Sequence, residues 1–381
     1  MFRLRYTALV VALLPTIASA SIFGPDARTE ALAGAGINAT HAAAAFYNPA
    51  LTALGGQHSA ILLPAISLSA QDADSFVDSI DDFQRLNEQL QQDPTNPNLI
   101  LEWKAALLGL DGNQVSADGD IGGAFIIPTE LVAVTISASA SAEAIAIGQV
   151  DEDDFVGIPD PDNLVSNAQG LGVLVQEFGV SLARQFALDS GHHVAIGVTP
   201  KLQYIDTYAY AATVNNWDSD DWKDSRYRTQ SNGFNLDVGV AYTLNNGLRF
   251  GLAGRNLVKQ SVTTSDEAIA PLTLEVAPSW SAGAHYQSEW FALSAEAELT
   301  PTKRFAEFEQ KTQFVKVGVA FEAADWLELR GGYKSDLENT LQDMWTGGFG
   351  INIASTVVFD LFAGYGSDEQ YAAGGNFQIN F

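Results

Sequence analysis

The residue types that could carry out catalysis or hold a metal are few and scattered in this sequence. The histidines are His41, His58, His192, His193 and His285. None has a carboxylate at metal-ligand spacing, and no G-x-S-x-G turn for a nucleophilic serine occurs. An inward-facing His285 paired with a serine nucleophile is the enzymatic alternative, and a simple polar role for it is favoured. We therefore expect neither an enzyme nor a bound cofactor or metal.

Acidic residues greatly outnumber basic ones. The chain has 46 acidic and 19 basic residues, a net charge of −27 and a pI of ≈ 4.2. Binding of nucleic acid needs a basic surface, so we expect no nucleic acid partner. The run from Asp151 to Asp154 offers carboxylates to Ca²⁺ but lacks the spacing of a calcium loop, which favours a solvated face. The absence of cysteine excludes disulfides and thiol redox chemistry.

A second group of charged residues recurs at alternate positions along apolar segments. In 234–242, Phe234 and Val240 share one face while Asn235 and Asp237 share the other, which is the period of a strand. We expect the charged faces to line an interior, where opposite charges pair across neighbouring strands. The predicted interior charges are Asp237, Arg249, Arg255, Glu296, Glu298, Lys316, Glu328, Arg330 and Asp360.

Alternating segments of this kind recur throughout 57–381, and we count about fourteen of them. The connections between them alternate long and short, which predicts an all-β, transmembrane antiparallel β-barrel with short periplasmic turns and long outer loops. The longest connection, 71–120, has an apolar stripe at helical spacing and predicts a helix that caps the barrel mouth. The stripe consists of Phe76, Ile80, Phe83, Leu86 and Leu90.

The N-terminus has the pattern of a secretory signal. Residues 1–20 contain a basic start, an apolar run and an A-x-A cleavage site, so we expect the exported chain to begin at Ser21. No later stretch has the roughly 18 apolar residues that a membrane helix needs.

Residues 21–56 differ from the rest of the chain because they are rich in Ala and Gly and lack strand alternation. Their D-A-R-x-x-A-L-A-G-A-G and F-Y-N-P-A-L patterns resemble the N-terminal segment of FadL-like outer-membrane barrels, and more closely the conjugal-transfer TraF-like family. The resemblance implies an N-terminal lumen plug, or hatch. A thioredoxin-like TraF is excluded by the absence of cysteine. The plug motif residues are Gly34, Gly36, Phe46, Asn48, Pro49 and Leu51.

The last segment, 371–381, places Phe377, Ile379 and Phe381 on one apolar face. This pattern resembles the C-terminal insertion signal of bacterial outer-membrane barrels. The resemblance implies a closing strand that the barrel-insertion machinery recognises. It also implies a location in the outer membrane of a Gram-negative bacterium, among lipid and lipopolysaccharide.

Two residues do not fit regular strands. Pro200 lies within the segment 192–209 and cannot donate to a sheet hydrogen bond. A bulge is the favoured explanation, and the alternative is a parting of strands that forms a lateral opening for a hydrophobic ligand, as the FadL-like resemblance implies. Arg184 falls on the apolar face of 178–188, which a bulge, a membrane-interface position or a shifted register would explain.

The FadL-like resemblance implies a channel or binding protein for hydrophobic small molecules, an inference by analogy of fold. The alternative is a non-transporting structural or adhesion component of an envelope or conjugation apparatus. A wide apolar lumen favours the first function, and a sealed lumen filled with charges favours the second.

Overall fold

The computed structural model describes residues 24–381, except 40, 55–58, 73–74, 130, 158, 190, 219–220, 222–223, 355 and 368. The predicted signal peptide at 1–20, His58 and the glycines at 55 and 56 lie outside the described residues. The division of the chain into 21–56 and 57–381 therefore stays a prediction.

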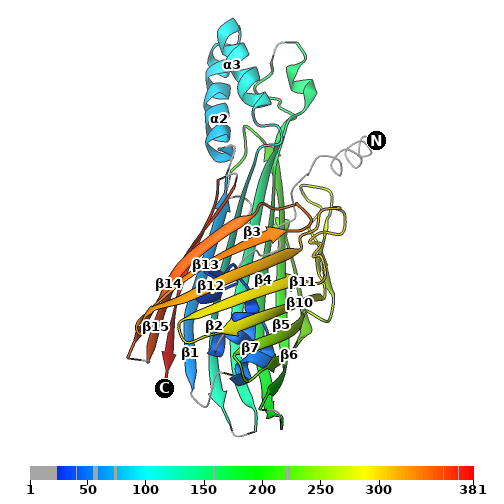
Figure 1. Cartoon of the computed structure of the whole chain (residues 1–381). Helices are drawn as coiled ribbons and strands as arrows, with labels where there is room; N and C mark the ends of the chain where they lie inside the picture. Colours follow the sequence, from blue (N-terminus) through cyan, green and yellow to red (C-terminus); the bar gives the residue numbers. More distant parts are fainter. Residues whose placement is uncertain are drawn as a thin grey trace.

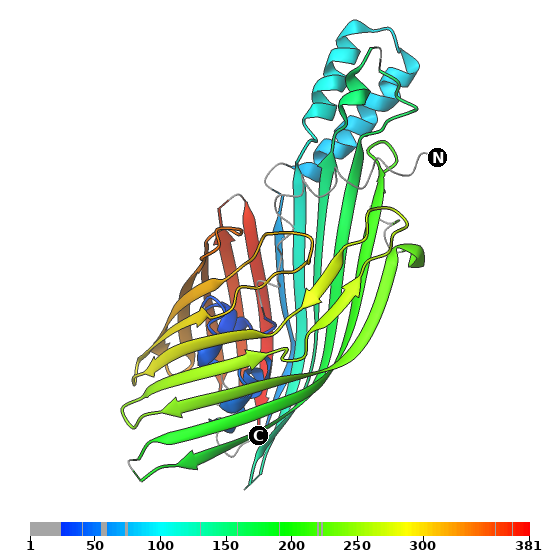
Figure 2. The same ribbon diagram turned by 90° about the vertical axis from the view of Figure 1, so that its right-hand side faces the viewer.

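Fourteen antiparallel strands close into a barrel, as predicted (Figures 1 and 2). Strand β1 pairs with β16 to close the ring, which is the arrangement that removes open sheet edges from a membrane. The barrel strands are β1 (Ala60–Gln71), β2 (Gln114–Pro128), β3 (Ala133–Gln149), β4 (Asn167–Ala187), β5 (His193–Thr213), β6 (Arg228–Thr243), β7 (Leu248–Arg255), β10 (Ser279–Gln287), β11 (Phe291–Glu298), β12 (Phe314–Ala324), β13 (Leu327–Asp336), β14 (Met344–Ile353), β15 (Val357–Gly366) and β16 (Gln370–Asn380).

Side chains alternate between the two faces of the barrel wall. On β6, Phe234 and Val240 are exposed on the outside, whereas Asn235 and Asp237 are buried on the inside. The wall therefore has an apolar outer face, which suits lipid, and a polar inner face.

Arg184 lies on the outer face of β4, near the end that joins the short turn to β5. The β4–β5 pairing keeps its register from Leu182 through Arg184 to Ala187, so neither a bulge nor a register error explains this residue. Its guanidinium lies 5.1 Å from the centre of the Phe186 ring. This is the environment of a membrane-interface position, where an arginine rests on an aromatic ring.

The barrel wall is much taller on the side of β3 to β6, called here the tall wall, than on the side of β10 to β15, called here the low wall. Strands β4 and β5 have 21 residues each, whereas β7 and β11 have 8 each. Figures 1 and 2 show β3, β4 and β5 rising past the rest of the barrel. Exposed aromatic residues mark both ends of the low strands, as expected at the two membrane interfaces. They are Trp290 and Trp326 at one end, and Trp345, Tyr365 and Tyr371 at the other.

Two helices stand above this tall wall, where one helix over the mouth was expected (Figure 1). They are α2 (Phe76–Gln92) and α3 (Pro97–Leu108). The ring centres of Phe83 and Trp103 lie 5.4 Å apart, and Trp103 Nε1 donates to Asn87 Oδ1 at 2.8 Å. The stripe predicted on α2 is thus buried mainly against α3. Neither helix, nor any other among the described residues, is long and apolar enough to cross a membrane.

Two connections fold inward against the tall wall. One contains a small sheet of β8 (Gln260–Thr263) and β9 (Thr273–Val276), and the other contains Phe305 and Phe308. Both pack on inward-facing apolar residues of the long strands, such as Val173 and Ile205. They form an apolar cover above the polar part of the lumen.

Candidate functional site

The described residues of 24–54, called here the lumen segment, lie inside the barrel as short helices (dark blue in Figures 1 and 2). These helices are α1 (Ala27–Glu30), η2 (Gly36–Asn38), η3 (His41–Phe46) and η4 (Pro49–Leu54). Their backbone is bonded to wall side chains: Ala33 N donates to Thr346 Oγ1 at 3.0 Å, and Ile37 N donates to Glu296 Oε2 at 2.8 Å. The wall therefore satisfies polar groups that such short helices cannot satisfy themselves.

Inward-facing glycines let the lumen segment lie directly against the wall. A Cβ atom added at Gly239 would overlap the Asn48 side chain, and one at Gly197 would overlap the Pro49 backbone. The same holds at further positions around the barrel, where the segment passes within contact distance of the wall backbone. These positions are Gly122, Gly251, Gly283, Gly318, Gly332 and Gly348.

The N-P-A-L part of the plug motif forms the contact with β5, β6 and β7. Asn48 Nδ2 donates to the backbone carbonyls of Val240 at 3.4 Å and Leu252 at 3.3 Å, and its Oδ1 accepts from Ala50 N at 3.0 Å. Pro49 and Leu51 are buried. Because an aspartate could not donate to two carbonyls, the amide is the side chain that this position requires.

Two further motif residues, Gly34 and Gly36, lie around Glu30 and its partner Tyr47. Gly34 adopts a positive φ of 74° beside the Glu30 carboxylate, and Gly36 packs against Tyr47. The carboxylate accepts from Gly24 N at 2.9 Å and from the Tyr47 hydroxyl at 3.1 Å. Burial raises the pKa of Glu30 to about 7, although Lys334 opposes this rise.

Several predicted interior charges meet in one cluster on the low wall. Arg330 binds Glu328 and Asp360, each at 2.6 Å, from β13 and β15. Arg28 of the lumen segment binds the same Glu328 at 3.1 Å. Asn376 Nδ2 of the closing strand donates to Asp360 at 3.1 Å. The cluster thus joins the lumen segment to three strands.

The other predicted charges are more widely separated. Lys316 lies 3.3 Å from Glu298, and Glu296 binds the lumen segment at Ile37, as described above. Within the described part of the chain, neither Arg249 nor Arg255 has an ion-pair partner within 4 Å.

Sequence reasoning missed the most deeply buried ion pair of the tall wall. Lys201 Nζ lies 2.9 Å from Glu177 Oε1 and 2.9 Å from Asp237 Oδ2, and the Lys201 side chain is 3% exposed. These three residues, called here the Lys201 cluster, come from β5, β4 and β6. Lys201 follows Pro200 at an inward position, so strand parity alone could have identified it as a lumen charge.

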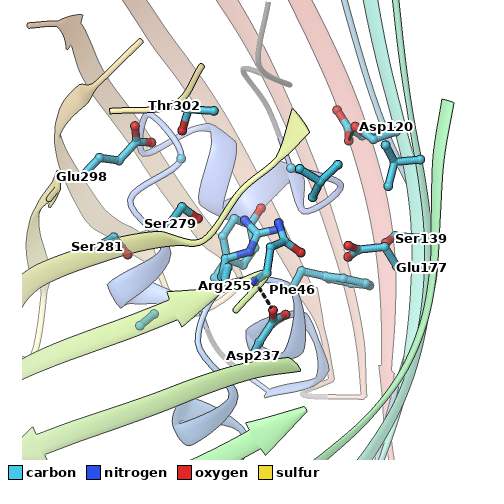
Figure 3. A pocket seen from close by; sticks show the side chains of 18 of the residues that line it. Phe46, Asp120, Ser139, Glu177, Asp237, Arg255, Ser279, Ser281, Glu298 and Thr302 are labelled. Carbon is cyan, nitrogen blue, oxygen red and sulfur yellow. Dashed lines mark hydrogen bonds between the residues drawn. The ribbon is translucent and has the colours of Figure 1, made fainter. Parts of the chain in front are cut away.

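A chamber of about 250 Å³ lies between the lumen segment and the inner face of the barrel, bounded by the tall strands and by β10, β11 and β12 (Figure 3). Phe46 and Glu30 bound it on the side of the segment, and the Lys201 cluster and Arg255 bound it on the side of the wall. Hydroxyl groups supply much of the rest of its lining. These belong to Ser137, Ser139, Ser141, Thr199, Ser279, Ser281, Thr302 and Thr312.

A second hollow, a groove of about 700 Å³, lies beside Pro200 and is lined largely by side chains of the outer face. Its lining is almost entirely apolar and includes Ile61, Phe125, Ile136, Phe178, Leu202 and Phe234. Ser137, Gly179 and Lys201 line both this groove and the chamber. At this place the paired backbones of β3, β4 and β5 separate the polar lumen from the apolar exterior.

The bulge predicted at Pro200 was wrong. Pairing of β4 with β5 stops at Gly179 and Lys201 and resumes at Leu182 and Val198 in the same register, so no residue is inserted. Instead, the Ser181 and Thr199 hydroxyls form a 2.7 Å hydrogen bond across the gap. A register shift does occur in β1 between Leu62 and Ile66, which brackets another proline.

The predicted closing strand pairs with both β15 and β1. Phe377 packs against Phe359, with ring centres 4.7 Å apart, and Ile379 pairs with Ile61. Phe381 N donates to Ser59 O at 2.9 Å. Its ring is stacked on that of Phe125 at 6.4 Å.

The structure adds no support for the catalytic site at His285 or the calcium site at Asp151 to Asp154 that were considered from the sequence. His285 Nδ1 lies 3.0 Å from Ser294 Oγ, but both residues are buried and neither lines the chamber or the groove. The Asp154 carboxylate accepts from the backbone of Val165 and Ser166, and so caps its own loop. No group of three or more His, Asp or Glu side chains in the described part of the chain could hold a metal.

A family model described as the F plasmid transfer operon TraF protein matches residues 45–297. The chain belongs to this family. No curated protein matches this TraF-family chain.

Solved structures show the fold that this TraF-family chain shares. The toluene transporter TbuX of Ralstonia pickettii matches with a TM-score of 0.61 and 13% identity, over 95% of this chain and 99% of that one. A FadL homologue of Pseudomonas aeruginosa matches with a TM-score of 0.55 and 11% identity, over 93% and 98% of the two chains. The CymD monoaromatic hydrocarbon channel matches with a TM-score of 0.54 and 14% identity, over 95% and 99%. The fold is therefore that of FadL-like outer-membrane barrels.

Proposed function

We propose that this barrel is an outer-membrane channel through which an amphipathic small molecule passes sideways from the lumen chamber into the bilayer. The observation that carries the proposal is that Ser137, Gly179 and Lys201 line both the polar chamber and the apolar outer groove. A molecule with a polar and an apolar part would find a matching surface on each side of this wall.

The broken pairing beside Pro200 supports passage at this place. Between Gly179 and Leu182, β4 is joined to β5 by side chains rather than by backbone pairing. Side-chain contacts can change their partners without unfolding of the strands, whereas parting a continuous ladder would leave backbone groups unsatisfied in lipid. This interruption supports the lateral opening at Pro200 that was considered as the alternative to a bulge.

The lumen is lined by charges, which were expected of a structural barrel, but it holds a chamber next to the apolar groove. This arrangement supports an amphipathic rather than a purely hydrocarbon substrate. Hydroxyl and charged groups dominate the lining of the chamber, and such groups bind polar parts of ligands. The names of the solved neighbours, a toluene transporter and a monoaromatic hydrocarbon channel, support a small aromatic or similarly apolar part. An aromatic molecule that carries one polar or charged group combines the polar and the apolar part.

The same proposal places the protein in the outer membrane of a Gram-negative bacterium. The long connections and the tall wall would face outward among lipopolysaccharide, and the short turns would face the periplasm. The barrel-insertion machinery would recognise the closing strand. The lumen segment would act as the hatch that blocks straight flow through the barrel.

Replacement of Pro200 by valine tests lateral passage. Valine restores a backbone donor, so the unfolding temperature should rise, and uptake should fall severalfold because the strands part less readily. Uptake is measured in proteoliposomes and in cells with three matched probes: toluene, benzoate and benzylamine. Gly331→Val on β13 is the control, since an added Cβ atom there meets only a backbone oxygen, at 3.9 Å.

A stabilised Pro200→Val protein that takes up all three probes at the wild-type rate would contradict lateral passage. The relative rates of the three probes also report the charge preference of the chamber. Faster uptake of toluene than of both charged probes would contradict the amphipathic substrate.

A contact role of the tall wall is the second candidate function. Leu101 and Leu108 of α3 are exposed, and the acidic loop between β3 and β4 packs against both helices. Such a surface could bind a partner of the envelope or conjugation apparatus. Replacement of both leucines by serine should then lower cell–cell adhesion or mating frequency and leave probe uptake unchanged. Unchanged adhesion would remove this candidate.

A further inference from the structure

We infer that Lys201 is the gating residue of the lateral opening: its ammonium group, held by Glu177 and Asp237, keeps β4, β5 and β6 together where the backbone pairing is interrupted. This inference rests on the proposed lateral passage and assigns its closure to particular side chains.

Position is the first argument. The interruption lies at Val180 and Ser181 on β4, opposite Pro200 and Thr199 on β5. Glu177 and Lys201 follow immediately on the side of the outer loops, and Asp237 pairs with Thr199 on the neighbouring strand. The Lys201 cluster therefore spans three strands at the level of the gap.

Steric closure is the second argument. Gly179 has no side chain, and a Cβ there would lie 2.9 Å from Thr199 Cγ2 and 3.5 Å from Lys201 Cβ. The space left by the glycine is thus filled by Thr199 and by the stem of Lys201. Movement of Lys201 would remove one of the groups that separate the chamber from the groove.

The way in which the two carboxylates are held is the third argument. Gln203 Nε2 donates to Glu177 at 2.5 Å, and Asn256 N donates to Asp237 at 2.8 Å. These bonds fix both acids independently of Lys201, so the lysine can leave and return to a prepared site. Figure 3 shows both acids directed into the chamber, where a polar ligand would meet them.

The low wall provides a matched control. Arg330 is also a buried cation between two carboxylates, Glu328 and Asp360, but it does not line the chamber. The backbone pairing of Arg330 itself, with Ala320 and Gly348, is unbroken. Loss of this cation should disturb its own strands and leave the β4–β5 gap unchanged.

The test measures amide hydrogen exchange of 177–183 and 197–203 in lipid nanodiscs. Lys201→Met should accelerate exchange at the gap by roughly a hundredfold, the effect of losing a buried ion pair, while Arg330→Met should not. Because Lys201→Met leaves two carboxylates without a cation, a neutral variant with Glu177→Gln, Lys201→Met and Asp237→Asn is measured in parallel. Heat-modifiable mobility on gels shows which variants are folded.

A reversible lock completes the test, because the protein contains no cysteine. Ser181→Cys with Thr199→Cys places two thiols where two hydroxyls now lie 2.7 Å apart. In the Lys201→Met background, oxidation of this pair should restore slow exchange at the gap, and reduction should release it. Wild-type exchange at the gap in the folded Lys201→Met and neutral variants would overturn the role of Lys201.

Uptake separates this inference from the proposed function. Fast exchange at the gap with unchanged uptake would support the Lys201 gate and contradict lateral passage. Slow uptake in Pro200→Val, with exchange at the gap unaffected by Lys201→Met, would support lateral passage and contradict the gate.

Discussion

The backbone amide of Ala27 donates a 2.8 Å hydrogen bond to Oδ1 of Asn376, so the first described helix is bonded to the closing strand. Asn376 also donates to Asp360, which binds Arg330. One buried side chain therefore links the lumen segment, the closing strand and the ion cluster of the low wall.

Asn376→Ala should destabilise the folded barrel by about 1–3 kcal/mol, because it leaves the Ala27 amide and one Asp360 oxygen without their partner. Urea unfolding in detergent micelles measures the change. Gln378→Ala on the same strand is the control, since Gln378 Nε2 donates to Asn380, within β16 itself. Equal stability of the two variants would contradict a linking role for Asn376.

Gly239→Val should displace the lumen segment, because its Cβ would overlap the Asn48 side chain. We expect greater conductance in planar bilayers and faster proteolysis within 24–54, similar to the effect of deleting the segment. Gly347→Ala, whose added atom meets only a backbone oxygen at 3.7 Å, should behave as wild type. If deletion of the segment itself leaves conductance unchanged, the segment does not block the lumen.

Stability should depend on pH through Glu30. Its folded pKa of about 7 exceeds the ordinary value of 4.5, because burial disfavours the charged carboxylate. Below about pH 4.5 the carboxyl is protonated in both the folded and the unfolded state, and the stability has its full value. This stability is lost as pH rises through about 7, because the buried carboxyl ionises. The unfolding free energy should fall by on the order of 3 kcal/mol over this window, and Glu30→Gln should flatten the fall. The same slope in both proteins would show that another group titrates.

Deletion of Phe381 should reduce assembly. It removes the hydrogen bond to Ser59 and the stacking on Phe125 that help to join β16 to β1 and β2. The heat-modifiable barrel band from outer membranes should become much weaker, while the total amount of translated chain stays constant. Wild-type yield of folded barrel would contradict a role for this residue in closure.

Membrane topology can be tested with single cysteines, since the sequence contains none. A cysteine at Asp153, in a long loop, should react with an impermeant reagent on intact cells. One at Asn246, in the short turn between β6 and β7, should react only after the outer membrane is opened. The reverse pattern would invert the proposed orientation.

The face on which a strand residue lies was predictable, because alternate positions of a strand point to opposite faces. Asp237, Arg330 and Asp360 could be assigned to the interior without knowledge of their neighbours. The ion-pair partners of interior charges could not be predicted in this way. The pairing of Lys201 with Glu177, for example, depends on the register between β4 and β5. Sequence alternation tells which face a residue occupies but not which residue lies beside it.

Two local predictions failed for identifiable reasons. Helix α3 was missed because Leu99, Ile100 and Leu101 are consecutive apolar residues, which hides a stripe of helical period. The bulge at Pro200 was wrong because the Ser181–Thr199 hydrogen bond and the Lys201 cluster join the strands without an inserted residue. Such compensation by side chains from other strands has no local signal in sequence.

The glycine contacts of the lumen segment have a consequence for how the barrel is made. The segment touches the wall backbone at Gly197, Gly239, Gly318 and Gly332, and these positions leave no clearance even for a methyl group. A helix cannot be threaded into a finished ring that fits it so closely. We therefore expect the segment to lie among the strands before β16 meets β1, so that the ring forms around it. The N-terminal residues would then serve during biogenesis as the internal template on which the cylinder is assembled.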